Sequence, residues 1–174
     1  MLRRMATLAL LTCMALLGRC LGANDSSGDP VKNLGAFEGK WHTEGTLANG
    51  DKTQSDMECR WTPQTRYLIC DQQVNIGGTL SDQLTVYGYE PAAHNYYYST
   101  FQERSFGPST GTLQIQGNVW TYNSAFERKG KRTQIRTTNE FIDPKTEIFK
   151  VAFSDDGGST WKEMMQGTAH KTGE

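Results

Sequence analysis

The sequence predicts an all-β protein that folds as a closed or nearly closed up-and-down antiparallel barrel of about ten strands. From Glu38 onward, runs of 7 to 11 residues rich in Thr, Tyr, Val, Ile, Phe and Trp alternate with clusters of Gly, Pro, Asn or Asp, as in antiparallel sheets. Nearly every connection is short enough for a hairpin, so consecutive strands should be neighbours. An open sheet of this length would expose two long edges, and closure into a barrel removes them.

The first 23 residues predict a signal peptide. A basic start, MLRR, precedes an apolar run of 13 residues, MATLALLTCMALL, and small residues up to Ala23 suit a cleavage site. The run is shorter than the about 20 apolar residues that a membrane-spanning helix needs. We therefore expect an exported protein, periplasmic or extracellular, with no membrane span. Residues 24–33 are mostly polar and are expected to form a flexible leader, which leaves residues 34–174 as a single barrel domain.

The charge balance disfavours nucleic acid and anionic membranes as partners. The chain has 18 basic and 19 acidic residues, and loss of Arg3, Arg4 and Arg19 with the signal peptide leaves 15 basic residues and a net charge of -4. Nucleic-acid-binding domains normally carry an excess of basic residues clustered on one face. A small molecule is the expected kind of partner, and the sequence indicates no oligomeric state.

Nine turn segments divide the chain into the ten expected strands. Each contains the Gly, Pro, Asn, Asp or Ser residues that turns favour. They lie at residues 48–51, 62–65, 76–78, 90–95, 105–110, 116–118, 128–131, 142–145 and 154–159. No stretch shows a helical period of sufficient length, but a short turn of helix around Leu34 to Phe37 would plug one end of a barrel.

The cysteine spacing predicts a cross-strand disulfide. Two cysteines leave with the signal peptide, and the remaining pair, Cys59 and Cys70, flanks the TPQT turn in MECRWTPQTRYLIC. If that turn centres between its last two residues, Cys59 is opposite Cys70 and Trp61 is opposite Leu68. Directly opposed residues of antiparallel strands are close enough to be bridged, and an oxidising compartment favours the bond. Two buried free thiols are the alternative.

Strand alternation does not decide whether the barrel interior is filled or contains a cavity. Many positions that should face inward are Thr, Ser, Gln or aromatic residues rather than Leu and Val. The interior is either packed with side chains or contains a partly polar cavity able to hold one small ligand. A filled interior would favour a structural or protein-interaction module, whereas a cavity of about 300 Å³ or more would favour ligand binding. The candidate cavity contacts are Tyr87, Tyr98, Tyr122 and Arg136, because aromatic and cationic groups recur in such pockets.

Several stretches together resemble a family of small secreted bacterial proteins that is classified only as a domain of unknown function. They are GAFEGKWHTEGTL, MECRW with YLIC, VYGYEPAAHNYYYSTF, GNVWTY and FSDDGGSTWKEMMQGTAHK, and the resemblance runs from about Gly35 to Lys171. It implies a lipocalin-like, or calycin-like, barrel with no accepted activity. Gly39 and Trp41 are similar to the G-x-W motif that opens lipocalins, which implies that Trp41 closes one end of the barrel.

The stretch SDDGGSTW resembles the Asp-box of sialidase propellers. In those proteins the motif recurs and ties a β-turn away from the catalytic pocket, with the Trp packed beneath it. Here it occurs once, in a chain too short for a propeller. We therefore interpret Ser154, Asp156, Gly158, Thr160 and Trp161 as a structural turn, in which Asp156 ties the loop and Trp161 is an apolar anchor.

Two sequence matches suggest a hydrolase site and a haem site, but the surrounding sequence does not predict the structure that such sites need. GPSTG fits the G-x-S-x-G pattern of hydrolases, and Ser109, Asp143 and His170 occur in hydrolase order. The residues after Ser109 form a strand, however, whereas this nucleophile requires a turn that leads into a helix. His170 is also the candidate axial ligand of a haem-binding barrel, although its alternation with Trp161 and Met165 favours an outward side chain. We expect no catalytic site, no metal site and no cofactor, with haem and hydrolase functions as minor alternatives to a non-enzymatic ligand-binding barrel.

Overall fold

The computed structural model describes residues 28–103, 107–128 and 130–174, and within these ranges the chain forms ten β-strands and one short 3-10 helix. The expected signal peptide (1–23) and residues 24–27 of the expected leader lie outside the described residues. The elements are η1 (Pro30–Phe37), β1 (Gly39–Leu47), β2 (Lys52–Trp61), β3 (Leu68–Ile76), β4 (Thr79–Glu90), β5 (Asn95–Gln102), β6 (Ser109–Gln116), β7 (Val119–Arg128), β8 (Lys131–Asp143), β9 (Thr146–Ser154) and β10 (Lys162–Gly173). The prediction of ten strands is confirmed.

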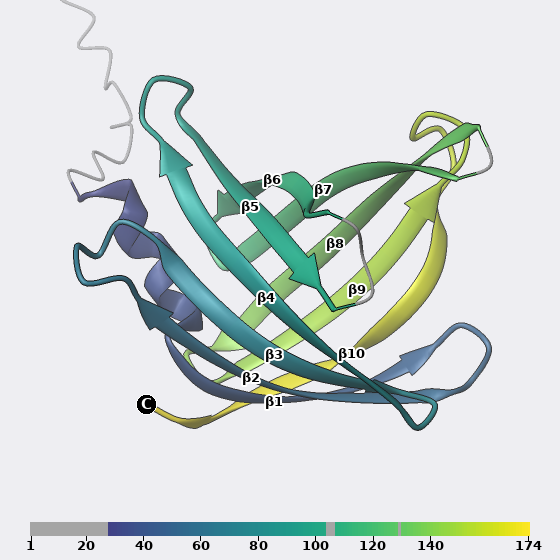
Figure 1. Ribbon diagram of the computed structural model, residues 1–174, viewed down its shortest axis with the longest axis horizontal. Helices are drawn as coiled ribbons and strands as arrows, with labels where there is room; N and C mark the ends of the chain where they lie inside the picture. The colour runs from purple at the N-terminus through teal and green to yellow at the C-terminus, as the bar shows by residue number, and fades with distance from the viewer. Residues whose placement is uncertain (1–27, 104–106, 129) are drawn as a thin grey trace, which may run out of the picture.

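The strands form a closed barrel in which each strand pairs with its neighbours in sequence. The order around the barrel is β1-β10-β9-β8-β7-β6-β5-β4-β3-β2, and all pairs are antiparallel. Antiparallel pairing of β1 with β10 closes the barrel, so no strand is left with an unpaired edge among the described elements. The predicted all-β, closed up-and-down barrel is therefore confirmed (Figure 1).

The seam between β1 and β10 depends on two opposed glycines. Gly45 and Gly167 are directly paired across this seam. A Cβ atom on Gly167 would lie 2.1 Å from the carbonyl oxygen of Glu44 and 2.7 Å from a ring carbon of Phe149. Such distances are not compatible with any side chain, so glycine is required here for the close approach of the two strands under the Phe149 ring.

The helix η1 covers one end of the barrel, as the expected helical turn near Leu34 would (Figure 1). Leu34 and Phe37 are buried, and the Phe37 ring contacts the rings of Trp41 and Trp120 at centroid distances of 6.1 and 4.9 Å. The Trp41 indole N–H donates a hydrogen bond to the Phe37 carbonyl oxygen over 2.9 Å, and this Trp is only 1% exposed. The helix begins at Pro30, so the helical segment extends four residues before Leu34.

The β2–β3 hairpin has the register that the cysteine spacing predicts. Cys59 pairs with Cys70 and Trp61 with Leu68, and the structure joins the two cysteines in a disulfide. Both cysteines are buried in the core near η1. The bond therefore ties the β2–β3 hairpin at the end of the barrel that η1 covers.

A search for membrane-spanning helices in the described residues finds no helix that is long and apolar enough to cross a bilayer.

Candidate functional site

A cavity of about 570 Å³ lies inside the barrel. Its floor is made by residues near η1, including Phe37, Trp41 and Tyr87. At the opposite end it is lined by Ile76 and Thr79, which flank the β3–β4 turn. Hairpin turns such as β1–β2 and β3–β4 surround that end in Figure 1, so the cavity extends from the floor beneath η1 toward the opposite end of the barrel.

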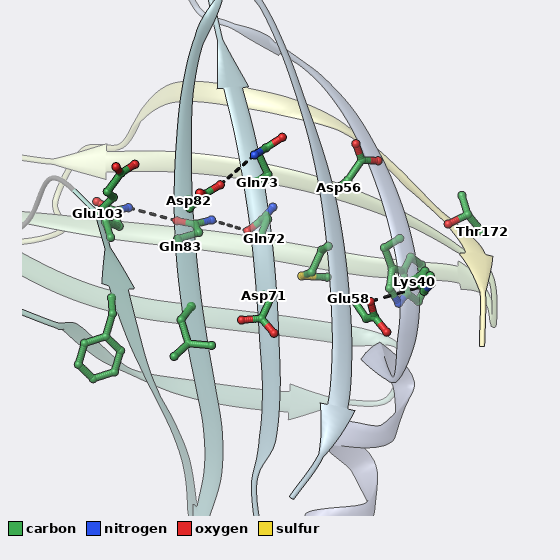
Figure 2. Close-up of a pocket in the computed structure, with 15 residues that line it drawn as sticks. Lys40, Asp56, Glu58, Asp71, Gln72, Gln73, Asp82, Gln83, Glu103 and Thr172 are labelled. Atoms are coloured by element: carbon green, nitrogen blue, oxygen red, sulfur yellow. Dashed lines mark hydrogen bonds and ion pairs between the residues drawn. The ribbon is translucent and has the colours of Figure 1, made fainter.

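The wall formed by β2 to β5 is polar, and its side chains pair with one another. Gln72 donates to Ser55 Oγ over 2.7 Å, Gln83 donates to Gln72, and Gln102 donates to Gln83 over 3.3 Å. Figure 2 shows this row of amides crossing the strands. The paired amides give this side of the cavity a polar but internally satisfied surface.

The three tyrosines expected as cavity contacts line the cavity together. Tyr87 on β4, Tyr98 on β5 and Tyr122 on β7 have ring centroids 5.5 to 6.3 Å apart, in tilted or edge-on arrangements that aromatic rings favour. Burial is the main cause that raises the pKa of Tyr87 and of Tyr122, so both hydroxyls are neutral. Together they form an aromatic surface above the floor.

Arg136, the fourth expected contact, does not line the cavity. It alternates with Thr137, which lines the cavity, so its side chain lies on the outer face of β8. Its guanidinium carbon lies 4.0 Å from the ring centre of Trp161, which corresponds to a cation–π contact. The expectation rested on residue type, whereas the period of the strand decides which face a side chain occupies.

Buried polar groups occupy the wall formed by β7, β8 and β9. Asn139 and Glu147 line the cavity and are 7% and 4% exposed. Burial raises the pKa of Glu147 to about 8, and the Asn139 amide beside it lowers that pKa by a smaller amount. One oxygen each of Tyr122, Asn139 and Glu147 has no hydrogen-bond partner within the described part of the chain.

The sequence interpretation missed Asn139 and Glu147. Glu147 begins a run in which Phe149 and Val151 share its face, and all three line the cavity. Period-two alternation from those two apolar residues was the signal that places Glu147 inside. For Asn139, the spacing of two residues from Thr137, which also lines the cavity, gives the same information.

A second, more exposed hollow of about 780 Å³ involves outward side chains of β1 to β5. Figure 2 shows its carboxylates, including Asp56, Glu58, Asp71 and Asp82. Contacts within the protein already engage all four: Asp56 with His42 (2.7 Å), Glu58 with Lys40 (4.0 Å), Asp71 with Arg60, and Asp82 with Gln73 (3.0 Å). Among the described residues no group of three or more His, Cys, Asp or Glu side chains could hold a metal ion. The interior cavity is therefore the stronger candidate site.

The SDDGGSTW segment forms a tightly hydrogen-bonded turn between β9 and β10. Ser154 Oγ donates to Asp156 (2.7 Å) and accepts from the Gly158 N–H (2.8 Å). The Thr160 hydroxyl and N–H donate to the Asp156 carboxylate over 2.6 and 2.9 Å, and these bonds hold the pKa of that carboxyl far below its usual range. The Trp161 indole donates to the Gly158 carbonyl oxygen over 3.0 Å. Each contact ties the turn to itself and none is directed into the cavity.

The hydrolase residues do not come together. Ser109 is at the start of β6 and lines the cavity, whereas His170 is exposed on β10, four strands away around the barrel. Asp143, at the end of β8, interacts electrostatically with His170 but not with Ser109. His170 alternates with Ala169, which lines the cavity, so His170 points away from the space that a haem would need.

A family model described as "Protein of unknown function (DUF1579)" matches residues 27–171. The chain belongs to the DUF1579 family. The resemblance to a family of unknown function that its motifs indicate is therefore confirmed, and the match covers the whole barrel from before η1 into β10. No curated protein matches the sequence.

Several solved structures are similar in architecture to this DUF1579 protein. An S-type phycobiliprotein lyase from Guillardia theta is similar with a TM-score of 0.54 at 9% identity, over 80% of this chain and 90% of the lyase chain. EF1p2_mFAP2b bound to DFHBI is similar with a TM-score of 0.45 at 10% identity, over 83% of this chain and 100% of that one. A fluorescence-activating β-barrel designed de novo has a TM-score of 0.43 at 12% identity, with coverage of 79% of this chain and 94% of the designed one. At such identities the likeness to the lyase shows a shared β-barrel fold and nothing about function.

Proposed function

We propose that this protein is an exported, non-enzymatic lipocalin-like barrel that binds one small, partly apolar ligand in its interior. The observation that carries the proposal is the cavity of about 570 Å³ between the aromatic floor and the end of the barrel opposite η1. Ligand sites in proteins typically have volumes of about 300–1,000 Å³ and combine an apolar lining with a few convergent polar groups. Export is supported by the signal-peptide pattern of residues 1–23.

The cavity favours binding over the alternative of a filled, purely structural barrel. A barrel whose interior is packed leaves few voids larger than a water molecule. Aromatic rings near the floor offer contact area to an apolar body, and the polar walls offer orientation. Ser109, Asp143 and His170 lie apart in the barrel, so the hydrolase alternative has no convergent triad to support it.

Adjacent threonines on β8 provide a matched test. Thr137 lines the cavity, and Thr138 follows it on the outer face of the same strand. We expect the neutral fluorophore N-phenyl-1-naphthylamine to bind the wild-type protein with a rise in emission. Thr137→Trp should weaken this binding at least tenfold because the indole occupies the cavity, whereas Thr138→Trp should leave it unchanged.

Circular dichroism would check that both variants fold. If Thr137→Trp does not fold, Val151→Trp on β9, which also fills the cavity, takes its place. Absence of fluorophore binding to the wild-type protein would contradict the proposal. Equal binding by the inward and outward tryptophan variants would also contradict it, because the fluorophore would then bind outside the barrel.

A further inference from the structure

One wall of the cavity carries buried polar atoms that no described residue satisfies. Within the described residues, Asn139 Oδ1 and Glu147 Oε2 have no hydrogen-bond partner. The Tyr122 hydroxyl accepts no hydrogen bond from these residues, and the Tyr87 hydroxyl beside it is the one neighbour that affects its pKa through a side-chain contact. The three side chains come from β7, β8 and β9 and are each more than nine-tenths buried. Buried polar atoms nearly always have a partner, so oxygens left without one among the described residues point to a partner beyond them, such as a bound ligand.

The three residues lie on a diagonal across neighbouring strands. Tyr122 pairs with Thr137, two residues before Asn139, and Asn139 pairs with Phe149, two residues after Glu147. Diagonal neighbours on one face of a sheet are about 7–8 Å apart and are within reach of long side chains. All three line the same cavity, and Glu147 raises the pKa of Tyr122 electrostatically, so the outermost two of the three groups interact across this wall.

The charge of the lining restricts what that group can be. None of the described residues that line the cavity is Lys, Arg or His, and Glu147 is the only carboxylic acid among them. A carboxylate or phosphate on a ligand would therefore meet no cation and would face an acid. A protonated amine has three N–H donors and a positive charge, which match three oxygens of which one is a carboxylate.

The aromatic rings beside this wall favour the same ligand. Tyr98 and Tyr122 are 5.5 Å apart at their ring centres, and Tyr87 lies 6.3 Å from Tyr122. The faces of such rings attract cations, and their edges and carbons pack against an apolar chain or ring. The polar wall and the aromatic surface together fit a molecule with a basic head and an apolar body.

We propose that Tyr122, Asn139 and Glu147 bind the protonated amine of a ligand whose apolar remainder packs against the aromatic part of the cavity. This inference rests on the proposed function and names the chemical class of its ligand, an apolar primary amine. Glu147 supplies the negative charge, while Asn139 and Tyr122 accept the remaining N–H groups and fix the orientation of the head.

Binding of an ammonium group to Glu147 makes affinity depend on pH. Burial raises the pKa of Glu147 to about 8, so a proton competes with the ligand below that pH. The titratable groups that face it from other elements are the hydroxyls of Tyr87 and Tyr122, which are neutral in this range. Its paired neighbours on β8 and β10, Phe141 and Ala169, do not ionise. Affinity should therefore fall by up to about tenfold per unit as the pH decreases below 8.

Three probes of equal chain length separate the ligand classes: decylamine, 1-decanol and decanoate. Isothermal titration calorimetry at pH 8 should show decylamine binding the wild-type protein at least tenfold more tightly than the other two. Glu147→Gln should remove this preference and the dependence on pH between 6 and 8. Glu140→Gln, which changes an exposed acid on the outer face of β8, should retain both.

Several results would overturn the inference while leaving the proposed function intact. They are equal binding of decylamine and 1-decanol, binding of decanoate as tight as that of decylamine, or an unchanged preference in Glu147→Gln. Failure of all three probes, when N-phenyl-1-naphthylamine still binds, would also overturn it. If that fluorophore does not bind either, the proposed function fails together with the inference.

Discussion

Glu147 makes the stability of the barrel depend on pH. Its pKa is raised from 4.5 to about 8 by burial, so between these values the folded protein holds a proton that the unfolded chain releases. The contribution of Glu147 to the free energy of unfolding is therefore largest below about pH 4.5 and decreases as the pH rises to 8. The free energy of unfolding should fall by up to about 4 kcal/mol between pH 5 and pH 8, at about 1.4 kcal/mol per unit.

Urea unfolding of the wild-type protein and Glu147→Gln across this range measures the effect. The amide cannot ionise, so the variant should show a much flatter pH profile and should be more stable than the wild type at pH 8. Asp143 and Asp156 have lowered pKa values and affect stability only at more acidic pH. A wild-type profile that is flat from pH 5 to 8 would show that Glu147 is not buried as described.

The strand face on which each side chain lies explains which site residues could be predicted from the sequence. The three tyrosines were chosen by residue type and line the cavity, but the same criterion chose Arg136, which lies over Trp161 on the outer face. Glu147 escaped notice because acidic residues in a strand normally mark the solvent side. Alternation from Phe149 and Val151 on the same strand is the signal that would have placed it inside.

At the scale of elements, the β2–β3 hairpin is stabilised by its disulfide. The bridge joins residues 11 apart in sequence, and closing a loop of this size is worth about 3 kcal/mol in the chain-entropy description. Reduction under native conditions, or the Cys59→Ser/Cys70→Ser variant, should lower the free energy of unfolding by about this amount. Thermal unfolding with and without reductant measures it, and an unchanged melting temperature with two titratable thiols would disprove the bridge.

The glycine pair at the β1–β10 seam should tolerate no side chain. In Gly167→Ala the new methyl group would overlap the Glu44 carbonyl oxygen, which is backbone and cannot move without separating the strands. We expect a loss of about 1–3 kcal/mol, as for other overpacked sites. Gly35→Ala is the control, because its Cβ would have only an ordinary contact at 3.7 Å with Trp61. Equal stability of the two variants in urea would show that the seam is not as tight as described.

The elements themselves were predictable because their signals are local. Gly, Pro, Asn and Asp clusters end the strands near the expected turns where those turns lie within the described residues, and short turns force neighbours in sequence to pair. The hairpin register that brings Cys59 opposite Cys70 follows from the length of one turn. The closing pair is different, because the contact of β1 with β10 joins the two ends of the domain and was inferred only from the need to cover edges.

At the scale of the whole molecule, the sequence could not decide whether the barrel is open or filled. That property depends on how side chains from ten strands share one volume, and alternation gives only the face on which each lies. The structure divides the interior into an aromatic floor beneath η1, a wall of paired amides and a wall with unpartnered oxygens. The remaining space of about 570 Å³ is the basis of the proposed function.

Native and denaturing mass spectrometry of the protein purified from its natural source tests this account most directly. The native spectrum should show one small molecule bound per chain, and denaturation should release it. A released molecule with a basic nitrogen and an apolar body would agree with both proposals. A protein that carries nothing in the native spectrum, and takes up neither N-phenyl-1-naphthylamine nor decylamine when these are added, would contradict the claim that the barrel binds a ligand.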